Sequence, residues 1–436
     1  MEAPEDLVWS EAIRCTSTIQ ETESLRNRAA DEDKMNDLSL LRRSFDSDRI
    51  TEFAESLATS LDRQMKNAFR PEERKALRLF SAREVCELTG ISNSNLNTRL
   101  ADDPDFPQPT LDKRGHRWFS AEAIDQIRDH MFLTGKKDLT YRPGRQPGNA
   151  MQVISFVNFK GGSGKTTSAA HVAQKLALDG YRVLAVDLDA QASLTTLFGY
   201  RPELEFQENG TVYDCLRYDE EQVGMEHIIL KTYFHNLDLA PAGLILAEYE
   251  TNTAYALSQR ITPNFAERLS IQLDRVQDRY DVVIIDCPPQ LGFTTLSALA
   301  ASSGLIVTVV PNMLDIASMS QFLSLAGDLF RTIQTHTSRS EPISWNFVKF
   351  LLTRYEPSDG PQTQMAAYLR TILQDEVLTN PMLKSTAISD AGMTQQTVFE
   401  VDPAKLLRKT LDRAVQSCTA VTQEVESLIQ RSWGRV

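Results

Sequence analysis

From Met151 onward, continuous apolar runs alternate with amphipathic stretches, and this alternation limits the folds that the chain can adopt. The runs are MQVISFVNF, RVLAVDL, LDLAPA, DVVIID, GLIVTVVP and WNFVKFLLTRY. Strands that are apolar on both faces are typical of parallel sheets covered by helices on either side. We therefore predict an α/β domain with a mainly parallel sheet, running to about residue 400 and followed by a C-terminal helix.

Size, charge and cysteine content narrow the class of protein. The chain has 436 residues, enough for two or three domains, and 42% of them are hydrophobic. Its net charge of −13 excludes a uniformly basic coat for nucleic acid but allows a local basic patch. The five cysteines are too scattered for a disulfide framework or a metal pair. The acidic start and the absence of a long apolar run favour a soluble, cytoplasmic protein.

Composition divides the chain into four parts. Residues 1–79 are charged and helical in spacing, with a narrow apolar stripe of Leu57, Leu61 and Met65. They predict a helical arm that packs on a partner or on a dimer mate, with a loosely ordered linker as the alternative. Residues 80–138 form a separate small domain. Residues 139–149, LTYRPGRQPGN, are typical of a linker, and 150–436 hold the α/β domain.

The segment 80–138 has the pattern of a winged helix-turn-helix. Ser81 and Ser92 can each cap a short helix, and Gly90 lies at the turn between them. The next stretch, LDKRGHRWFS, predicts a β-hairpin with a basic tip. The alternative is an ordinary helical hairpin with an exposed charged loop. If the segment binds DNA, the candidate contacts are Ser92, Asn93, Asn95, Asn97 and Arg99 on the second helix, and Lys113, Arg114 and Arg117 at the hairpin.

A long helix is predicted from Pro403 onward. The residues on its apolar side are Leu406, Leu407, Leu411, Val415 and Val421. Four basic residues, Lys405, Arg408, Lys409 and Arg413, lie near its start, and the first three are the candidates for contacts with DNA. A solvated face is the plain interpretation of these charges, and a patch that contacts DNA phosphates without reading sequence is the other.

The stretch NFKGGSGKTT, residues 158–167, follows the first strand and has the composition of a phosphate-binding loop. A glycine-rich turn leads into a helix beginning near Lys165, so backbone N–H groups and a positive helix end converge there. Lys165 is expected to reach the β- and γ-phosphates of a nucleotide, and Thr166 to bind Mg²⁺. The predicted cofactor-binding residues of the loop are Lys160, Gly161, Gly162, Ser163, Gly164, Lys165, Thr166 and Thr167.

Two later motifs place carboxylates at the ends of strands. The run VVIID ends with Asp286, the expected position of a residue that holds Mg²⁺ through water. In AVDLDAQASLT, Asp189 is nearer the carboxyl end of the strand and is expected to orient the attacking water, whereas Asp187 supports the loop. The predicted metal-binding residues are Thr166, Asp189 and Asp286. Pro311 and Asn312, after the strand GLIVTVV, are the candidates for contacts with the base.

Lys160 is an additional charge in the loop. The standard pattern G-x-x-x-x-G-K-[ST] fails, because Phe159 occupies the position five before Gly164. A lysine on the first turn points away from its own phosphates, so in one subunit Lys160 is expected to be solvated. In a face-to-face dimer it can reach the nucleotide of the other subunit and stabilise charge in the transition state.

Three motifs resemble a known family. KGGSGKTT, VDLDAQ and IIDCPPQLG are similar to the deviant Walker A, switch and Walker B elements of the ParA/MinD ATPases, over roughly residues 151–400. The helical arm and the winged helix-turn-helix resemble those of the large plasmid-partition ParA proteins. The sequences of the motifs NFKGGSGKTT and DLDAQASLT are most similar to the RepA type of repABC plasmids. Many relatives have proline and glycine where this chain has Ala190 and Ala192, which leaves its hydrolysis rate open.

The resemblance implies the following properties. ATP or ADP binds with Mg²⁺, and ATP drives a homodimer in which Lys160 and Lys165 both act on phosphates while Asp189 orients water. A ParB-type centromere-binding partner stimulates slow hydrolysis. The N-terminal domain binds a specific operator and represses the protein's own operon, and the ATPase dimer binds DNA without sequence preference, so the protein associates with the nucleoid.

Three other functions compete with plasmid partition. A membrane-positioning ATPase of the MinD type needs a basic amphipathic C-terminal helix, but SLIQRSWGRV has only sparse apolar positions. A metal-cluster protein needs a second cysteine suitably spaced from Cys287, and a buried thiol is the plain interpretation. A transcriptional repressor with regulatory nucleotide binding and a degenerate ATPase fold conflicts with the intact catalytic set, although repression and hydrolysis can coexist.

Overall fold

The computed structural model describes residues 49–53, 55–57, 59–60, 75–135, 138–206, 210–336 and 343–435, without the side chains of 333–336. The chain divides into two compact units, Met1–Glu73 and Arg74–Val436. The described residues of the first unit are helical, and Leu57 is exposed there. Leu61 and Met65, the other members of the predicted apolar stripe, lie outside the described residues.

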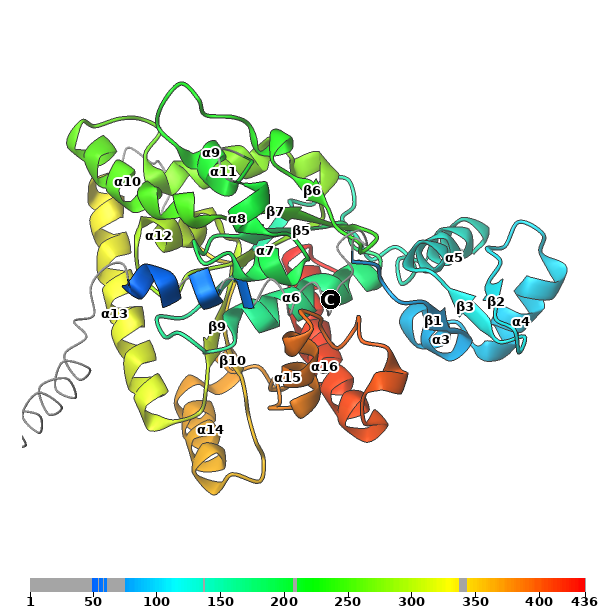
Figure 1. Cartoon of the computed structure of the whole chain (residues 1–436). Coiled ribbons are helices and arrows are strands. Elements are labelled where there is room, and N and C mark those ends of the chain that lie inside the picture. Colours follow the sequence, from blue (N-terminus) through cyan, green and yellow to red (C-terminus); the bar gives the residue numbers. More distant parts are fainter. Residues whose placement is uncertain are drawn as a thin grey trace, which may run out of the picture. The chain divides into compact units, whose positions relative to one another are not determined.

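The second unit is organised around a seven-stranded sheet in the order β10-β9-β4-β8-β5-β7-β6 (Figure 1). Its strands are β4 (Gln152–Val157), β5 (Val183–Asp187), β6 (Leu230–Lys231), β7 (Leu237–Ala240), β8 (Val282–Asp286), β9 (Gly304–Val309) and β10 (Phe347–Leu352). All neighbouring strands are parallel except β6 and β7. The predicted parallel sheet is therefore confirmed. Strand β6 was not predicted, because two residues are too few to give a periodic signal.

Helices cover both faces of this sheet. They are α6 (Lys165–Leu178), α7 (Ser193–Leu197), α8 (Pro202–Glu205), α9 (Val212–Leu216), α10 (Glu248–Ser258), α11 (Phe265–Asp274), α12 (Phe293–Ala301), α13 (Met313–His336), α14 (Gly360–Leu373), α15 (Thr386–Met393) and α16 (Arg408–Ser432). Side chains alternate along each strand. Ile154 and Phe156 therefore share one core with α6 and α16, whereas Val153 and Val157 share the other with α11 and α12. Among the described residues, no helix is both long enough and apolar enough to cross a membrane.

A smaller group of elements precedes the sheet, and we call residues 80–134 the N-terminal module. It comprises β1 (Phe80–Ser81), α3 (Ala82–Thr89), α4 (Asn93–Asp102), β2 (Thr110–Leu111), β3 (Arg117–Phe119) and α5 (Ala121–Thr134), with β3 between β1 and β2 in an antiparallel sheet. Ser81 and Glu84 form a capping box at the start of α3. Gly90, with φ of 73°, ends that helix, and the Ser92 hydroxyl caps α4. Two capped helices and a hairpin thus lie where the sequence predicts them.

Residues 139–149 pack against the larger sheet and the C-terminal helix. The carbonyl oxygen of Pro143 accepts hydrogen bonds from Gln430 Nε2 at 3.0 Å and from Arg435 at 2.8 Å. The Arg145 backbone N–H donates to the Asp281 carboxylate, which directly precedes β8. The proline and arginine residues that suggest a linker therefore supply specific contacts within the unit.

The C-terminal helix differs from its prediction at its start. Residues Pro403–Lys405 form a single 3-10 turn, and α16 begins only at Arg408. Leu407 is 80% exposed, so its predicted place on the apolar side is wrong. It occupies the extended position before the helix, where the backbone does not yet follow the helical period. The buried stripe runs instead through Leu411, Val421 and Ile429, while Val415 is partly buried.

Replacement of Ile429 by alanine is expected to lower the free energy of unfolding by about 2–5 kcal/mol, because it leaves a cavity in the core that α16 shares with α6. Leu407→Ala is the matched control and should change stability by less than about 0.5 kcal/mol. Denaturant unfolding followed by circular dichroism measures both. Equal losses in the two variants would contradict the described burial of α16.

Candidate functional site

The loop between β4 and α6 has the geometry of a phosphate cradle. Gly162 and Gly164 have φ of 76° and 83°, a left-handed region that favours glycine. A Cβ on Gly164 would lie 3.3 Å from the Thr353 side chain. Gly164 occupies the N-cap of α6, where no side chain caps the helix, so N–H groups of its first turn are available to an anion.

Residues that follow β10 hold this loop from behind. The Thr353 hydroxyl donates to the Ser163 carbonyl oxygen at 2.6 Å, and the Arg354 guanidinium donates to the Gly162 carbonyl oxygen at 3.2 Å. These two hydrogen bonds fix the backbone of the loop at Gly162 and Ser163. The sequence did not predict the role of Thr353 and Arg354. No motif in residues 353–355 marks them as partners of a loop that lies almost two hundred positions earlier.

Lys165 is buried at the start of α6. Its ammonium donates to the Lys160 carbonyl oxygen at 3.3 Å. Burial lowers the pKa of Lys165, and the nearby carboxylates of Asp286 and Asp189 oppose this shift. A largely desolvated lysine whose described partner is one carbonyl oxygen is well suited to bind an incoming phosphate.

Asp286 ends β8 and is completely buried beside the loop. Among the described residues, neither of its carboxylate oxygens has a hydrogen-bond partner of ordinary geometry. Burial, and then the neighbouring Asp187, raise the pKa of Asp286 well above its usual range, whereas Thr166 and Lys165 lower it. A carboxylate in this condition is ionised only when a cation accompanies it, and its oxygens and the Thr166 hydroxyl are the ligands that Mg²⁺ prefers. The residues present therefore fit a magnesium ion.

Asp187 and Asp189 have different surroundings, as the sequence predicts. Asp187 is buried at the end of β5, and one of its oxygens accepts from both the backbone N–H and the hydroxyl of Thr195, each at 2.8 Å. Its other oxygen accepts the Asp189 backbone N–H at 3.1 Å. Asp187 thus fixes the start of the following loop, while the Asp189 carboxylate is partly exposed and accepts the Gln191 N–H at 2.9 Å.

The side chain of Lys160 is paired, which corrects the expectation that it is solvated in one subunit. Its ammonium lies 2.8 Å from the carboxylate of Asp315, a residue in the first turn of α13. Asp315 is 3% exposed and Lys160 is 42% exposed. The sequence did not reveal this partner, because α13 reaches the loop only through the parallel pairing of β9 with β4.

The candidate base-contacting residues lie beside the same loop. Pro311 is buried, and the Asn312 side chain accepts the Asp315 backbone N–H at 2.9 Å, which caps α13. Asn312 and Lys160 border a cavity of about 280 Å³. Its other lining residues are Gly161, Gly162, Val310, Asp315, Arg354, Gln362 and Lys384. The structure thus brings Asn312 to the phosphate loop but gives it a capping contact of its own.

The predicted DNA contacts fall in two other places. On α4, Ser92, Asn93 and Asn97 are exposed and Asn95 is partly exposed, and Lys113, Arg114 and Arg117 are exposed on the hairpin. Arg117 donates to Asn97 and joins the hairpin to α4. Arg99 instead pairs with Asp103 and contacts His130 of α5. Lys405, Arg408 and Lys409 are exposed around the start of α16.

The chain resembles known proteins along most of its length. A family model described as an AAA domain matches residues 151–338. A Rhizobium rhizogenes protein named "Putative replication protein A" is 46% identical over 384 residues, which cover 88% of this chain and 94% of that protein. A Sinorhizobium fredii protein of the same name is 44% identical over 392 residues, covering 89% and 95%. A solved structure described as a partition protein has a TM-score of 0.60 at 18% identity and covers 87% of this chain and 99% of its own, which supports the fold.

The substitution Asp286→Asn is expected to raise the stability of the nucleotide-free chain by about 1–4 kcal/mol, because an amide avoids the cost of burying or protonating a carboxylate whose pKa is raised by burial and by Asp187. Asp281→Asn is the matched control. Asp281 is also buried and lies one residue before β8, but its carboxylate pairs with Arg182 at 2.7 Å, so its replacement should destabilise. Thermal unfolding without nucleotide measures both effects, and destabilisation by both variants would contradict an uncompensated Asp286.

Proposed function

The chain belongs to the ParA/MinD family of P-loop ATPases, in the branch that holds the plasmid replication protein A relatives, and we propose that it is the ATPase that segregates a plasmid. The observation that carries this proposal is the buried, unpartnered carboxylate of Asp286 beside Lys165 and an uncapped helix start. Those groups form an arrangement complementary to a nucleotide phosphate chain with Mg²⁺.

Each group in the loop has a separate task in this proposal. The backbone N–H groups of 161–167 and the Lys165 ammonium bind the phosphates of ATP or ADP. Thr166 and Asp286 hold Mg²⁺, which supplies positive charge to the phosphoryl oxygens. Asp189, whose backbone Asp187 fixes, orients the water that attacks and contributes to the metal site.

Lys160 links hydrolysis to assembly. Its ammonium pairs with Asp315, and both residues border the 280 Å³ cavity. In a homodimer joined across this surface, Lys160 of one subunit contacts the phosphates bound by the other. The Lys160 ammonium leaves Asp315 and binds the phosphates held by the other subunit, so dimerisation depends on the bound nucleotide.

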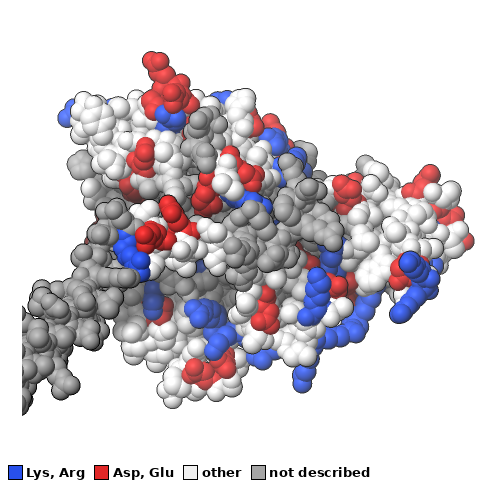
Figure 2. All heavy atoms as spheres, in the orientation of Figure 1, with Lys and Arg blue, Asp and Glu red and all other residues white. Residues whose placement is uncertain are grey.

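Two surfaces bind DNA in this proposal. The N-terminal module, within a domain of residues 80–138, binds a specific operator and represses the protein's own operon, with α4 in the major groove and the basic hairpin on the backbone. The 150–436 domain binds DNA of any sequence through Lys405, Arg408 and Lys409, whose charges do not depend on base identity. Figure 2 shows Lys and Arg interspersed with Asp and Glu, so a local cluster and not the overall charge must attract DNA.

The remaining partners follow from the family. A ParB-type centromere-binding protein stimulates hydrolysis. Residues 1–79 act as a dimerisation arm, and residues 139–149 connect the domains. The protein works in the cytoplasm on the nucleoid.

The second candidate function is a transcriptional repressor with regulatory nucleotide binding. It is supported by the capped helices and hairpin of the N-terminal module, which need no hydrolysis to bind an operator.

Sedimentation with ADP or a slowly hydrolysed ATP analogue tests the proposal. The analogue should convert the wild type to a dimer, and Lys160→Ala should keep nucleotide binding but lose dimerisation and hydrolysis. Lys165→Ala should lose nucleotide binding itself. Asp315→Asn is the control for the ion pair and should still dimerise. If the wild type binds the nucleotide without any change in assembly or hydrolysis, the repressor is the better assignment.

Charge reversal separates the two DNA surfaces. Lys405→Glu, Arg408→Glu and Lys409→Glu together should weaken analogue-dependent binding to random duplex and reduce the salt slope by roughly 0.9 per lost phosphate contact. Arg114→Glu should weaken operator binding and leave random duplex unaffected. Fluorescence anisotropy with the two duplexes at several salt concentrations distinguishes these outcomes. Unchanged binding of random duplex by the triple variant would exclude the start of α16 as its site.

A further inference from the structure

Lys75 precedes the N-terminal module and is inserted into a polar socket of the larger sheet domain. Its ammonium donates to the Leu197 carbonyl oxygen at 2.7 Å, to the Tyr233 hydroxyl at 2.9 Å and to the Glu400 carboxylate at 2.7 Å. It also donates to the Gln395 carbonyl oxygen. Its side chain is 8% exposed and that of Glu400 is 2% exposed. Because a buried charge is costly without such partners, this site is shaped specifically for a lysine.

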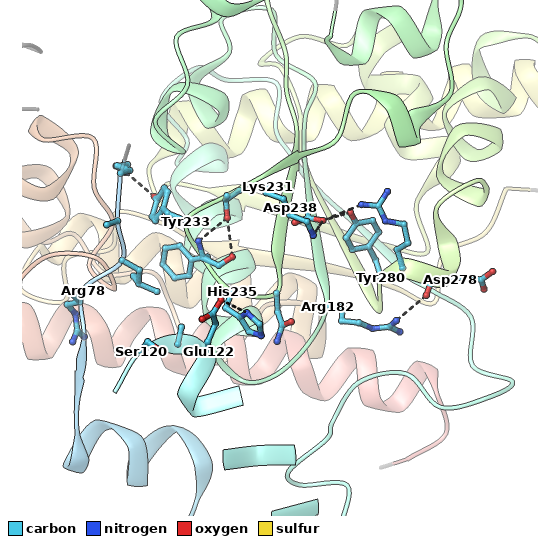
Figure 3. Close-up of a pocket in the computed structure, with 18 residues that line it drawn as sticks. Arg78, Ser120, Glu122, Arg182, Lys231, Tyr233, His235, Asp238, Asp278 and Tyr280 are labelled. Carbon is cyan, nitrogen blue, oxygen red and sulfur yellow. Dashed lines mark hydrogen bonds and ion pairs between the residues drawn. The ribbon is translucent and has the colours of Figure 1, made fainter. Parts of the chain in front are cut away.

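Gly199 and Tyr233 form two walls of the socket. Gly199 has φ of 88°, and a Cβ there would lie 3.0 Å from the aliphatic part of Lys75, so both the backbone and the contact favour glycine. The Tyr233 ring faces the ammonium, with its centroid 4.8 Å away. Figure 3 shows Tyr233 at one side of a cavity of about 930 Å³, together with His235 and the start of α5 at Ser120 and Glu122.

One wall of the socket belongs to the predicted switch. Leu197 is the last residue of α7, and α7 follows directly after the turn that contains Asp189. Ala192 at the start of α7 has φ of 51°, and the Asp187 carboxylate binds Thr195 in the middle of that short helix. One helix of five residues therefore connects the turn at Asp189 to the oxygen that Lys75 contacts.

The opposite side of Lys75 continues into the N-terminal module. Residues 76–79 lead to β1, whose Phe80 pairs with Phe119 of β3. Arg78 in this connection donates to the Phe399 carbonyl oxygen at 3.1 Å and pairs with Glu84 of α3 at 2.7 Å. The socket and the Phe399 contact together fix where α3 begins.

A second junction joins the module to the helix that leaves the phosphate loop. Arg128 of α5 is 3% exposed and donates to the carbonyl oxygens of Leu88 and Leu178. It also lies 3.7 Å from the carboxylate of Asp179, which caps the C-terminal end of α6. Both elements that leave the candidate nucleotide site, α6 and α7, thus end at contacts with the N-terminal module or its leading segment.

We propose that Lys75 is a positioning residue that couples the nucleotide state of the switch to the docking of the N-terminal module, and so regulates operator binding. The inference rests on the proposed function for the identity of the nucleotide and of the DNA. A nucleotide-dependent shift of the turn at Asp189 would move Leu197 and change the contacts of Lys75, and residues 76–79 would transmit the change to β1 and α3. The Arg128 contact responds in parallel through α6.

Hydrogen exchange measured by mass spectrometry tests the coupling on the full chain without DNA. In the wild type, ADP and a slowly hydrolysed ATP analogue with Mg²⁺ should alter exchange differently in peptides covering 75–91. Lys75→Met should lose most of that difference while the phosphate-loop peptide 158–167 still responds. Arg83→Met is the matched control, because Arg83 makes an exposed ion pair with Glu87 within α3 and should leave the response intact.

The double variant Lys75→Met with Glu400→Gln removes both buried charges and should fold if the single variant does not. It should also lack the nucleotide response in 75–91. The coupling is overturned if the nucleotide response in peptides 75–91 persists in either lysine variant. It is also overturned if the wild type lacks this response although its phosphate loop responds. An unresponsive phosphate loop in the wild type overturns the proposed function as well. If the exchange response is present but the protein has no affinity for any duplex, the coupling stands and only the DNA-binding role is excluded.

Discussion

The buried carboxylate of Asp286 imposes the constraint on which the rest of the site depends. Its oxygens are removed from water at the end of a central strand and lack a described hydrogen-bond partner. An isolated charge in such a place is unfavourable by several kcal/mol, so the ionised form of Asp286 is favoured only when a cation binds beside it. The parallel order of β9, β4, β8 and β5 then determines which loops surround that cation, because their carboxyl ends meet at one edge.

Local sequence was sufficient for the elements whose signal is contained in one stretch. Apolar runs predicted the parallel strands, and glycines before a lysine predicted the loop between β4 and α6. The different surroundings of Asp187 and Asp189 were also predictable, because a single residue separates them at the end of a strand. The capped helices of the N-terminal module follow from serines at the correct spacing.

Contacts between residues that are far apart in the sequence could not be predicted from local patterns. Thr353 and Arg354 support the phosphate loop, and Asp315 pairs with Lys160, yet no periodicity marks any of them. The helical period assigns Leu407 to the apolar side, but α16 begins only at Arg408. Leu407 therefore lies before the helix and is exposed. Nothing in the composition of residues 75–79 distinguishes Lys75 from a solvated lysine. Such contacts depend on the order of strands, which one sequence does not specify.

The socket of Lys75 also has a consequence for synthesis of the chain. Lys75 and Glu400 are separated by 325 positions, and the Gln395 carbonyl oxygen is almost as distant. During translation the N-terminal module leaves the ribosome long before either acceptor exists, so its short elements can form early but its connection to the sheet cannot. Contacts of such long range form late and slowly. A nascent or truncated chain ending before residue 395 therefore has the N-terminal module but lacks the acid that holds Lys75 in place.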